Sequence, residues 1–199
     1  AQYFPDNKGA GEAADDFRVP DGIKWRIKIV TIEGKWEPQN TNIDIDSVSV
    51  IIYKNKNGSP GDVACKEEDA QILAPETSDE MTLFLPKDDC VLNSGRYWLQ
   101  VLPYVPFGDN MNQFYWRESS SSNGNKFHWR DTEDIFVKKL NPCLTWSEAQ
   151  TCYYSPGPDL CFSLFGVTSE DTVLRPSEST SPHLGSLGSV FFAALLMLL

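Results

Sequence analysis

Aromatic side chains gather in one irregular stretch of the chain, and they are the residues best suited to hold a ligand. Two aromatic clusters occur between positions 103 and 141, at 114–116 and 127–129. Tyr and Trp offer a flat apolar face with a polar edge, which can stack on a sugar ring. Tyr115, Trp116 and Trp129 are therefore candidate carbohydrate-binding residues. The alternative is that the tryptophans fill the core between two sheets.

Carboxylates near the two ends of the expected domain are the candidate metal ligands. Asp15 and Asp16 lie near the first strand and Asp159 near the last, and such strands are often neighbours in a β-sandwich. Hard oxygen ligands suit Ca²⁺, although no D-x-D-x-D-G loop is present. The alternative is turn capping and hydrogen bonding by Asp. A second candidate group consists of Asn42, Asp44 and Asp46, and no cofactor other than calcium is expected.

Catalytic and zinc-binding arrangements find little support in the residue types. A nucleophilic hydrolase needs a base beside its Ser or Cys, and His128 is the one histidine of the expected folded part, flanked by aromatics. We expect it to be packed or on the surface. G-x-S-x-G and C-x-x-C motifs are absent. A glycosidase needs two facing carboxylates, but no spacing singles out a pair among 28 acidic residues. We expect a protein that is not an enzyme.

Five cysteines indicate an oxidising compartment if they pair. The close spacing of Cys143 and Cys152 predicts one bridge. Cys65 and Cys90 flank an expected strand and predict a second. Cys161 would then be unpaired and buried in the last strand. Four cysteines already permit three pairings, and the alternative is five reduced thiols in a cytosolic protein.

Size and charge exclude whole classes of partner. The chain has 199 residues and 22.4 kDa, and its 17 basic and 28 acidic residues give a net charge of −11 and a pI near 4.6. Nucleic-acid binding needs a concentrated basic footprint, and adsorption to anionic lipid also needs basic residues. The acidic balance argues against both. Six Trp, seven Tyr and eleven Phe are typical of β-rich extracellular domains.

The elements that must position these residues are predicted to be β-strands. In 23–29 the apolar residues are odd-numbered and the basic ones even-numbered, and the alternation resumes on even positions after Ile29-Val30, which predicts a β-bulge. Segments 46–54, 81–85 and 96–101 alternate too, as does a last strand at 160–165 that should end at Gly166. Asn57-Gly58 predicts a tight hairpin turn. We predict an all-β fold, an antiparallel two-sheet β-sandwich or jelly roll.

The composition divides the chain into four parts. We expect an N-terminal arm at 1–13, the sandwich domain at 14–167, a disordered Ser/Thr/Pro-rich stalk and spacer at 168–189, and a short apolar tail helix at 190–199. The sequon Asn57-Gly58-Ser59 at the predicted hairpin tip is a candidate glycosylation site on Asn57.

The apolar tail at 190–199 is too short to span a bilayer unaided. With the spacer at 182–189 and the small residues before it, the tail matches a glycolipid (GPI) anchor signal, and Ser179 is the predicted attachment residue. Such a signal requires secretion, so we expect the numbering to begin at Ala1 after removal of a signal peptide, or at a fragment boundary. The alternatives for the tail are a core element or a tail anchor inserted from the cytosol.

A set of short motifs follows one order along the chain. It runs ADDFRVP (14–20), a strand containing Trp25, SVSVIIYKN (47–55), PG (60–61), GRYW (95–98), Trp116, Trp129, NPCLTW (141–146), Cys152 and GPDLCF (157–162). This set resembles a family of secreted bacterial-type β-sandwich surface domains. The resemblance covers residues 14–166 and implies export and an antiparallel sandwich, but it supplies no catalytic residues. The chain departs from the family in its anchor signal, in Cys161 at a usually apolar position, and in the charged run 130–134, which replaces a glycine-rich loop.

The leading expectation is a non-catalytic, extracellular β-sandwich domain on the cell surface, GPI-anchored to the plasma membrane and used for adhesion or ligand binding. The ligand would be extracellular, with a cell-surface glycan as the candidate, and contact with the membrane would be through the lipid alone. Two alternatives from other classes are a structural coat protein without a specific ligand and a secreted, glycan-active hydrolase.

Overall fold

The computed structural model of this chain describes residues 1–4, 9–37, 45, 47–73, 79–88, 90–105, 113–133, 141–153 and 155–170. Several predictions concern residues outside these ranges: the stalk beyond residue 170, the anchor site Ser179, the tail 190–199, and the second calcium group of Asn42, Asp44 and Asp46. In the described ranges, none of the helices has the length and apolar character that crossing a membrane requires.

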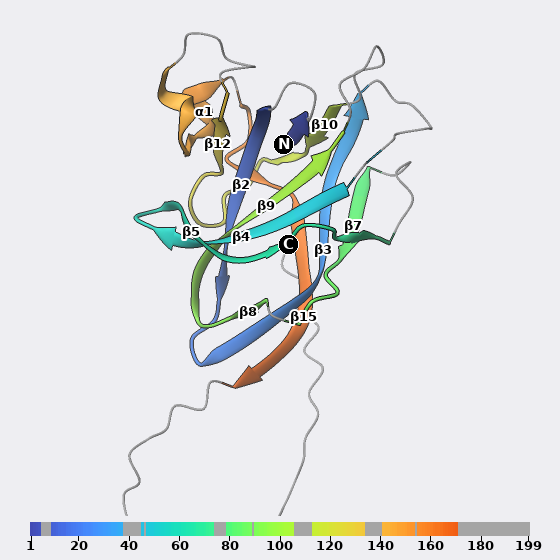
Figure 1. The fold of residues 1–199 in the computed structure, drawn as a ribbon. Coiled ribbons are helices and arrows are strands. Elements are labelled where there is room, and N and C mark those ends of the chain that lie inside the picture. The colour runs from blue at the N-terminus through green and yellow to red at the C-terminus, as the bar shows by residue number, and fades with distance from the viewer. Residues whose placement is uncertain are drawn as a thin grey trace, which may run out of the picture.

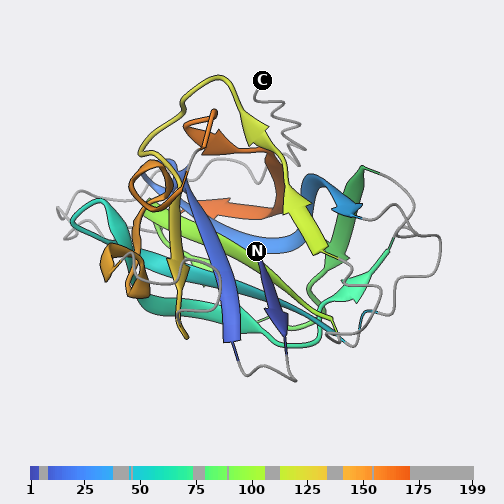
Figure 2. The same cartoon turned by 90° about the horizontal axis from the view of Figure 1, so that it is seen from above.

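The larger sheet has seven strands and forms one layer of the fold (Figures 1 and 2). In spatial order these are β13 (Ser147–Glu148), β12 (His128–Asp131), β2 (Gly9–Val19), β1 (Gln2–Phe4), β9 (Gly95–Tyr104), β4 (Ser47–Lys56) and β5 (Ser59–Glu67). The pairings are antiparallel except that β1 meets β9 in parallel at Tyr3 and Tyr104. Beyond β1, strands β2 and β9 pair directly.

The second sheet is organised around the long strand β3 (Ile23–Glu37), which has partners along both edges. One edge carries β7 (Glu80–Phe84) and β8 (Val91–Leu92), with β6 (Gln71–Ile72) outside β7. The other carries β10 (Gln113–Trp116) and β15 (Phe162–Glu170). A third pair, β11 (Glu118–Ser119) with β14 (Asp159–Leu160), continues from β10 and β15. The two large sheets pack face to face, so the predicted all-β sandwich is confirmed.

The alternation in β3 explains how one strand serves the core over its whole length. Ile27 is fully buried, and the buried positions then move to Val30 and Ile32. Opposite this shift, Phe165 pairs with Ile29 and Gly166 with Ile27, so Lys28 is the extra residue of a bulge. The bulge predicted from the sequence is therefore confirmed. The partner strand differs from its prediction, because it continues through Gly166 to the end of β15.

Strand β4 is buried on both faces, which its sequence alternation did not predict. Val48, Val50 and Ile52 face the core between the sheets as expected. On the other face Tyr53 joins Ala14, Ile51 and Trp98 in a second cluster, against which Trp146 packs. The guanidinium of Arg130 lies 4.3 Å from the centre of the Trp146 ring, a cation–π contact. The outer face of the large sheet is therefore covered in this region.

The turn after β4 agrees with its sequence. Asn57 and Gly58 have φ angles of 55° and 80° and join β4 to β5. Two successive positive φ angles are the geometry of a type I′ hairpin, which Asn-Gly favours. Asn57 is exposed at the tip.

The expected boundaries of the sandwich differ from those in the structure. Residues 1–13 were expected to be an arm, but β1 and the first half of β2 are inner strands of the large sheet. Ala10, Ala13 and Ala14 are buried there. Small residues and glycines on both faces give no apolar alternation, so the sequence carried no strand signal.

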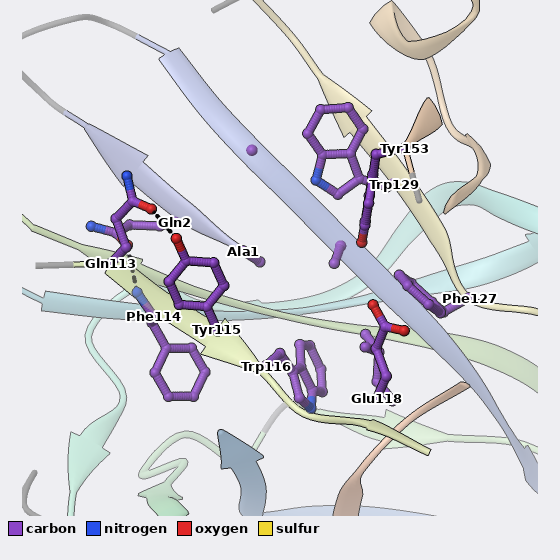
Figure 3. Close-up of a pocket in the computed structure, with 13 residues that line it drawn as sticks. Ala1, Gln2, Gln113, Phe114, Tyr115, Trp116, Glu118, Phe127, Trp129 and Tyr153 are labelled. Atoms are coloured by element: carbon purple, nitrogen blue, oxygen red, sulfur yellow. Dashed lines mark hydrogen bonds between the residues drawn. The ribbon is translucent and has the colours of Figure 1, made fainter. Parts of the chain in front are cut away.

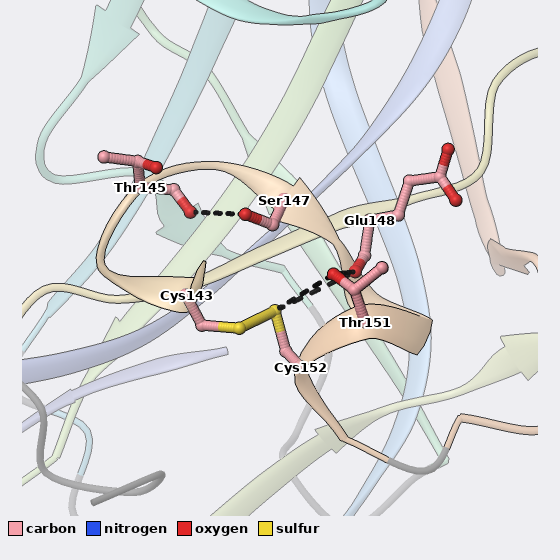
Figure 4. The surroundings of a disulfide bond; sticks show 6 residues. All are labelled: Cys143, Thr145, Ser147, Glu148, Thr151 and Cys152. Atoms are coloured by element: carbon pink, nitrogen blue, oxygen red, sulfur yellow. Dashed lines mark hydrogen bonds between the residues drawn. A yellow bond between two sulfur atoms is a disulfide. The ribbon is translucent and has the colours of Figure 1, made fainter. Parts of the chain in front are cut away.

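Both predicted disulfides are present. Cys65 of β5 bridges to Cys90, just before β8, with 5.3 Å between their Cα atoms, and so joins the two sheets. Cys143, in the 3-10 helix η2 (Asn141–Leu144), bridges to Cys152 at the end of α1 (Ala149–Cys152) with 5.8 Å between Cα atoms (Figure 4). Cys161 is free, as predicted, but it is half-buried and lies between β14 and β15.

We predict that Gly166→Ala destabilises the fold by about 1–3 kcal/mol, the usual cost of overpacking. A Cβ atom at this position would collide with the backbone carbonyl of Arg26 across the bulge. The measurement is urea unfolding, with Ser169→Ala, an exposed change on the same strand, as the control. An unchanged midpoint for Gly166→Ala would contradict this account of the bulge.

Candidate functional site

The candidate site is a cavity of about 400 Å³ at the place where β10 and β11 face the large sheet (Figure 3). Its lining comes from six strands, from residues that flank them and from the segment after α1. The lining residues are Ala1, Gln2, Gly11, Ala13, Gln113, Phe114, Tyr115, Trp116, Glu118, Phe127, Trp129, Tyr153 and Leu160. The three aromatic residues selected from the sequence therefore line one cavity, although they come from two segments.

Strand β10 supplies the aromatic wall. Its side chains alternate, so Phe114 and Trp116 point inward and are nearly buried, while Tyr115 is half-exposed. The hydroxyl of Tyr115 donates to Oε1 of Gln113, as Figure 3 shows. The backbone N–H of Phe114 donates to Oε1 of Gln2 at 2.8 Å, which holds β10 close to β1. The wall is thus fixed to both sheets.

The two tryptophans belong to the core and to the cavity at once. Trp116 is 7% exposed and Trp129 is 9% exposed, and both are members of the main hydrophobic cluster. The indole N–H of Trp116 donates to the carbonyl of Cys161 at 2.8 Å. The ring of Tyr153 meets Trp129 edge-on with 5.5 Å between centroids. Both interpretations of the tryptophans therefore hold, because the same two side chains fill the core and line the cavity.

Glu118 places a carboxylate in this aromatic setting. Its Oε2 accepts hydrogen bonds from the Ser155 hydroxyl at 2.9 Å and from the Gly157 N–H at 2.7 Å. Burial, and then the charge of Glu118, raise the pKa of Tyr153 well above its ordinary value. The Tyr153 phenol is therefore protonated at neutral pH and can donate a hydrogen bond.

The predicted calcium group does not assemble. Asp15 and Asp159 come together, but Asp16 points to other partners: Arg96, with which it forms an ion pair, and Asn125, whose N–H donates to Oδ1 at 2.7 Å. Successive residues of a strand face opposite sides of a sheet, so neighbouring Asp15 and Asp16 cannot share an ion this way. Among the described residues no group of three or more His, Cys, Asp or Glu side chains can hold a metal.

Asp15 and Asp159 form a buried carboxyl pair instead. Asp15 is 2% exposed, and its Oδ2 accepts from the N–H of Leu160 at 2.7 Å. The pKa of Asp15 is raised from 3.8 to about 8, chiefly by burial, while the Leu160 hydrogen bond lowers it and the Asp159 charge raises it. Burial also raises the pKa of Asp159, whose Oδ1 has no hydrogen-bond partner in the described structure. Neither residue lines the cavity.

His128 is packed, in agreement with its prediction. Its ring meets the Trp98 ring at 4.7 Å between centroids, and its Nδ1 lies 3.0 Å from the carbonyl oxygen of Lys126. Burial lowers its pKa. It faces the outer cluster, because it pairs with Ala14 on β2, whereas the next residue, Trp129, faces the cavity.

Three residues that line the cavity were not selected from the sequence: Gln113, Glu118 and Tyr153. Glu118 lies two residues after Trp116 and Gln113 two residues before Tyr115, so period-two alternation would place each beside an aromatic residue that was selected. Tyr153 follows Cys152 and carried no signal, because only the folded position of α1 brings it to Trp129.

Comparisons with protein-family models, with curated proteins and with solved structures give no match. The resemblance of the ordered motifs to secreted bacterial-type sandwich domains therefore stays a prediction.

We predict that Asp15→Asn flattens the pH dependence of stability between about pH 4 and pH 8. The raised pKa means that the folded protein keeps a proton which the unfolded chain releases in this window. The free energy of unfolding should then fall as pH rises, by up to about 1.4 kcal/mol per pH unit for one proton. Urea unfolding across the window measures this slope. Exposed Asp62→Asn is the control, and an equal slope in wild type and Asp15→Asn would refute the assignment.

Proposed function

We propose that this protein is a non-catalytic, extracellular carbohydrate-binding β-sandwich used for adhesion or ligand capture at a cell surface. The observation that carries the proposal is that Tyr115, Trp116 and Trp129 all line one cavity. Its volume, about 400 Å³, lies within the range of small-molecule sites.

The chemistry of the lining favours a sugar over a purely apolar ligand. A sugar ring has an apolar face suited to aromatic stacking and hydroxyl groups at its edge that need hydrogen-bond partners. The cavity offers aromatic faces from Trp116, Trp129 and Tyr153. It also offers polar groups at Gln113 and Glu118. Both halves of this requirement are met within one site.

The two disulfides support the extracellular part of the proposal. Structural disulfides persist in oxidising compartments and are rare in reducing ones. Cys65–Cys90 joins two sheets and Cys143–Cys152 ties the segment that leads to Tyr153. Reduction of Cys143–Cys152 would release the end of α1, next to Tyr153 of the cavity lining. An oxidising environment would therefore also stabilise the cavity.

The binding test uses the partly exposed aromatics at the cavity, because the buried tryptophans also support the core. Tyr115 is 50% exposed and Tyr153 is 38% exposed. We predict that Tyr115→Ala and Tyr153→Ala each weaken glycan binding about tenfold, the equivalent of about 1.4 kcal/mol of lost stacking. A glycan array identifies the ligand and calorimetry measures its affinity.

Phe165→Ala is the matched control for this test, since Phe165 is equally exposed but lies on β15, away from the cavity. It should leave glycan affinity unchanged. The absence of any glycan ligand would overturn the proposal in favour of a coat protein, and turnover of a bound glycan would replace it with an enzyme.

The compartment has its own test. We predict one reactive thiol per chain, that of Cys161, when the native protein is denatured without reductant, because the other four cysteines are bridged. Mass spectrometry after alkylation counts the modified residues. A count of five would contradict an oxidising compartment, and Cys161→Ser, with an expected count of zero, verifies which thiol reacts.

A further inference from the structure

The charge of the cavity narrows the chemistry of its ligand. Among the described residues that line it, Glu118 carries the one ionisable carboxylate, and no Lys or Arg side chain is present. Among the described lining residues Glu118 is therefore the one charged side chain, and it makes the cavity negative.

No cation within the described structure balances Glu118. The two donors to its Oε2, the Ser155 hydroxyl and the Gly157 N–H, are neutral. The neighbouring Arg117 is committed elsewhere, because its Nη1 forms an ion pair with Oε2 of Glu33 at 2.9 Å. Two neutral hydrogen bonds orient the carboxylate without cancelling its charge, which stays available to a ligand.

The aromatic lining adds to this preference. The face of an aromatic ring is the negative end of its quadrupole, so Trp and Tyr rings attract cations as well as sugar faces. In Figure 3 the Glu118 carboxylate and the Tyr153 hydroxyl are directed toward one another, in the part of the cavity that Trp129 also lines. A cationic group there would meet a half-buried carboxylate and aromatic rings together, where electrostatic attraction is stronger than between fully solvated groups.

We propose that the cavity selects saccharides that carry a protonated amine, with the ammonium group of an amino sugar held between Glu118 and the aromatic rings. This inference rests on the proposed carbohydrate-binding function and adds its selectivity. A neutral sugar would stack without the ionic contact. A uronic acid would be repelled by Glu118, because like charges at short range are unfavourable.

The test compares ligands that differ only in charge. Calorimetry on the full chain at pH 6 would use a short β-linked glucosamine oligomer, its fully N-acetylated counterpart, a neutral glucose oligomer of equal length and a glucuronate-containing one. We expect the free amine to bind at least about tenfold more tightly than the acetylated form, a difference of about 1.4 kcal/mol. The glucuronate ligand should bind most weakly.

Glu118→Gln removes the charge but keeps a side-chain oxygen that can accept from Ser155 and Gly157. It should abolish the preference for the amine, so that the variant binds the free amine and the acetylated oligomer with equal affinity. Glu68→Gln, which removes the same charge from an exposed position, should preserve the preference. Should Glu118→Gln fail to fold, the wild-type preference should still shrink between about 0.01 M and about 1 M salt, since screening weakens partly exposed ionic contacts.

The possible failures are distinguishable. Equal affinity for the amine and the acetylated oligomer overturns the selectivity and leaves carbohydrate binding intact. Tetramethylammonium, a cation that is not a sugar, is a further ligand in the same calorimetry. If it binds and no saccharide does, the proposed carbohydrate-binding function itself is overturned. A preference for the amine that survives Glu118→Gln overturns the role of Glu118.

Discussion

The second sheet depends on β3, a strand of fifteen residues that hydrogen-bonds to other strands along both of its edges. The bulge at Lys28 lets β3 keep an apolar side toward the core along this length. Near Gly34 its edge passes from β15 to β10, and a side chain at Gly34 would collide with Phe114. The chain then continues from β10 into β11, which pairs with β14 instead of β3, and residues of all three strands β10, β11 and β14 line the cavity.

The acidic composition is distributed into very different environments. Glu12 is neutralised by Arg130, whose Nη2 lies 2.6 Å from its Oε2, and it also accepts from Gln100 at 2.9 Å. Asp16 has Arg96, whereas Asp15 and Asp159 are both buried, and the charge of Asp159 raises the pKa of Asp15. Such pairs must share or keep a proton, because burying two adjacent charges is costly. Net charge alone therefore says little about the local field that a ligand would meet.

Local rules predicted much of this fold, and long-range packing decided the rest. Alternation located β3, β4, β7 and β9, Asn57-Gly58 located a hairpin, and spacing paired the cysteines correctly. The first half of strand β2 was not predicted, because small residues lie on both of its faces and both faces are buried. The aromatic cavity residues were found by type, but Tyr153 and Glu118 were not, because their meeting depends on where α1 and β11 dock. The carboxylates failed as a metal group since strand geometry sends neighbours to opposite faces.

The bridge between Cys65 and Cys90 also bears on how the molecule tolerates proteolysis. It closes a loop with a sequence separation of 25 that contains β6 and β7, and it joins one sheet to the other. A peptide bond cut anywhere in that loop would leave two fragments covalently attached, with β7 still paired to β3. Re-association would then be intramolecular, at the high effective concentration of a tethered pair. In a nicked molecule the bridge therefore keeps both fragments of the sandwich in one covalently linked unit.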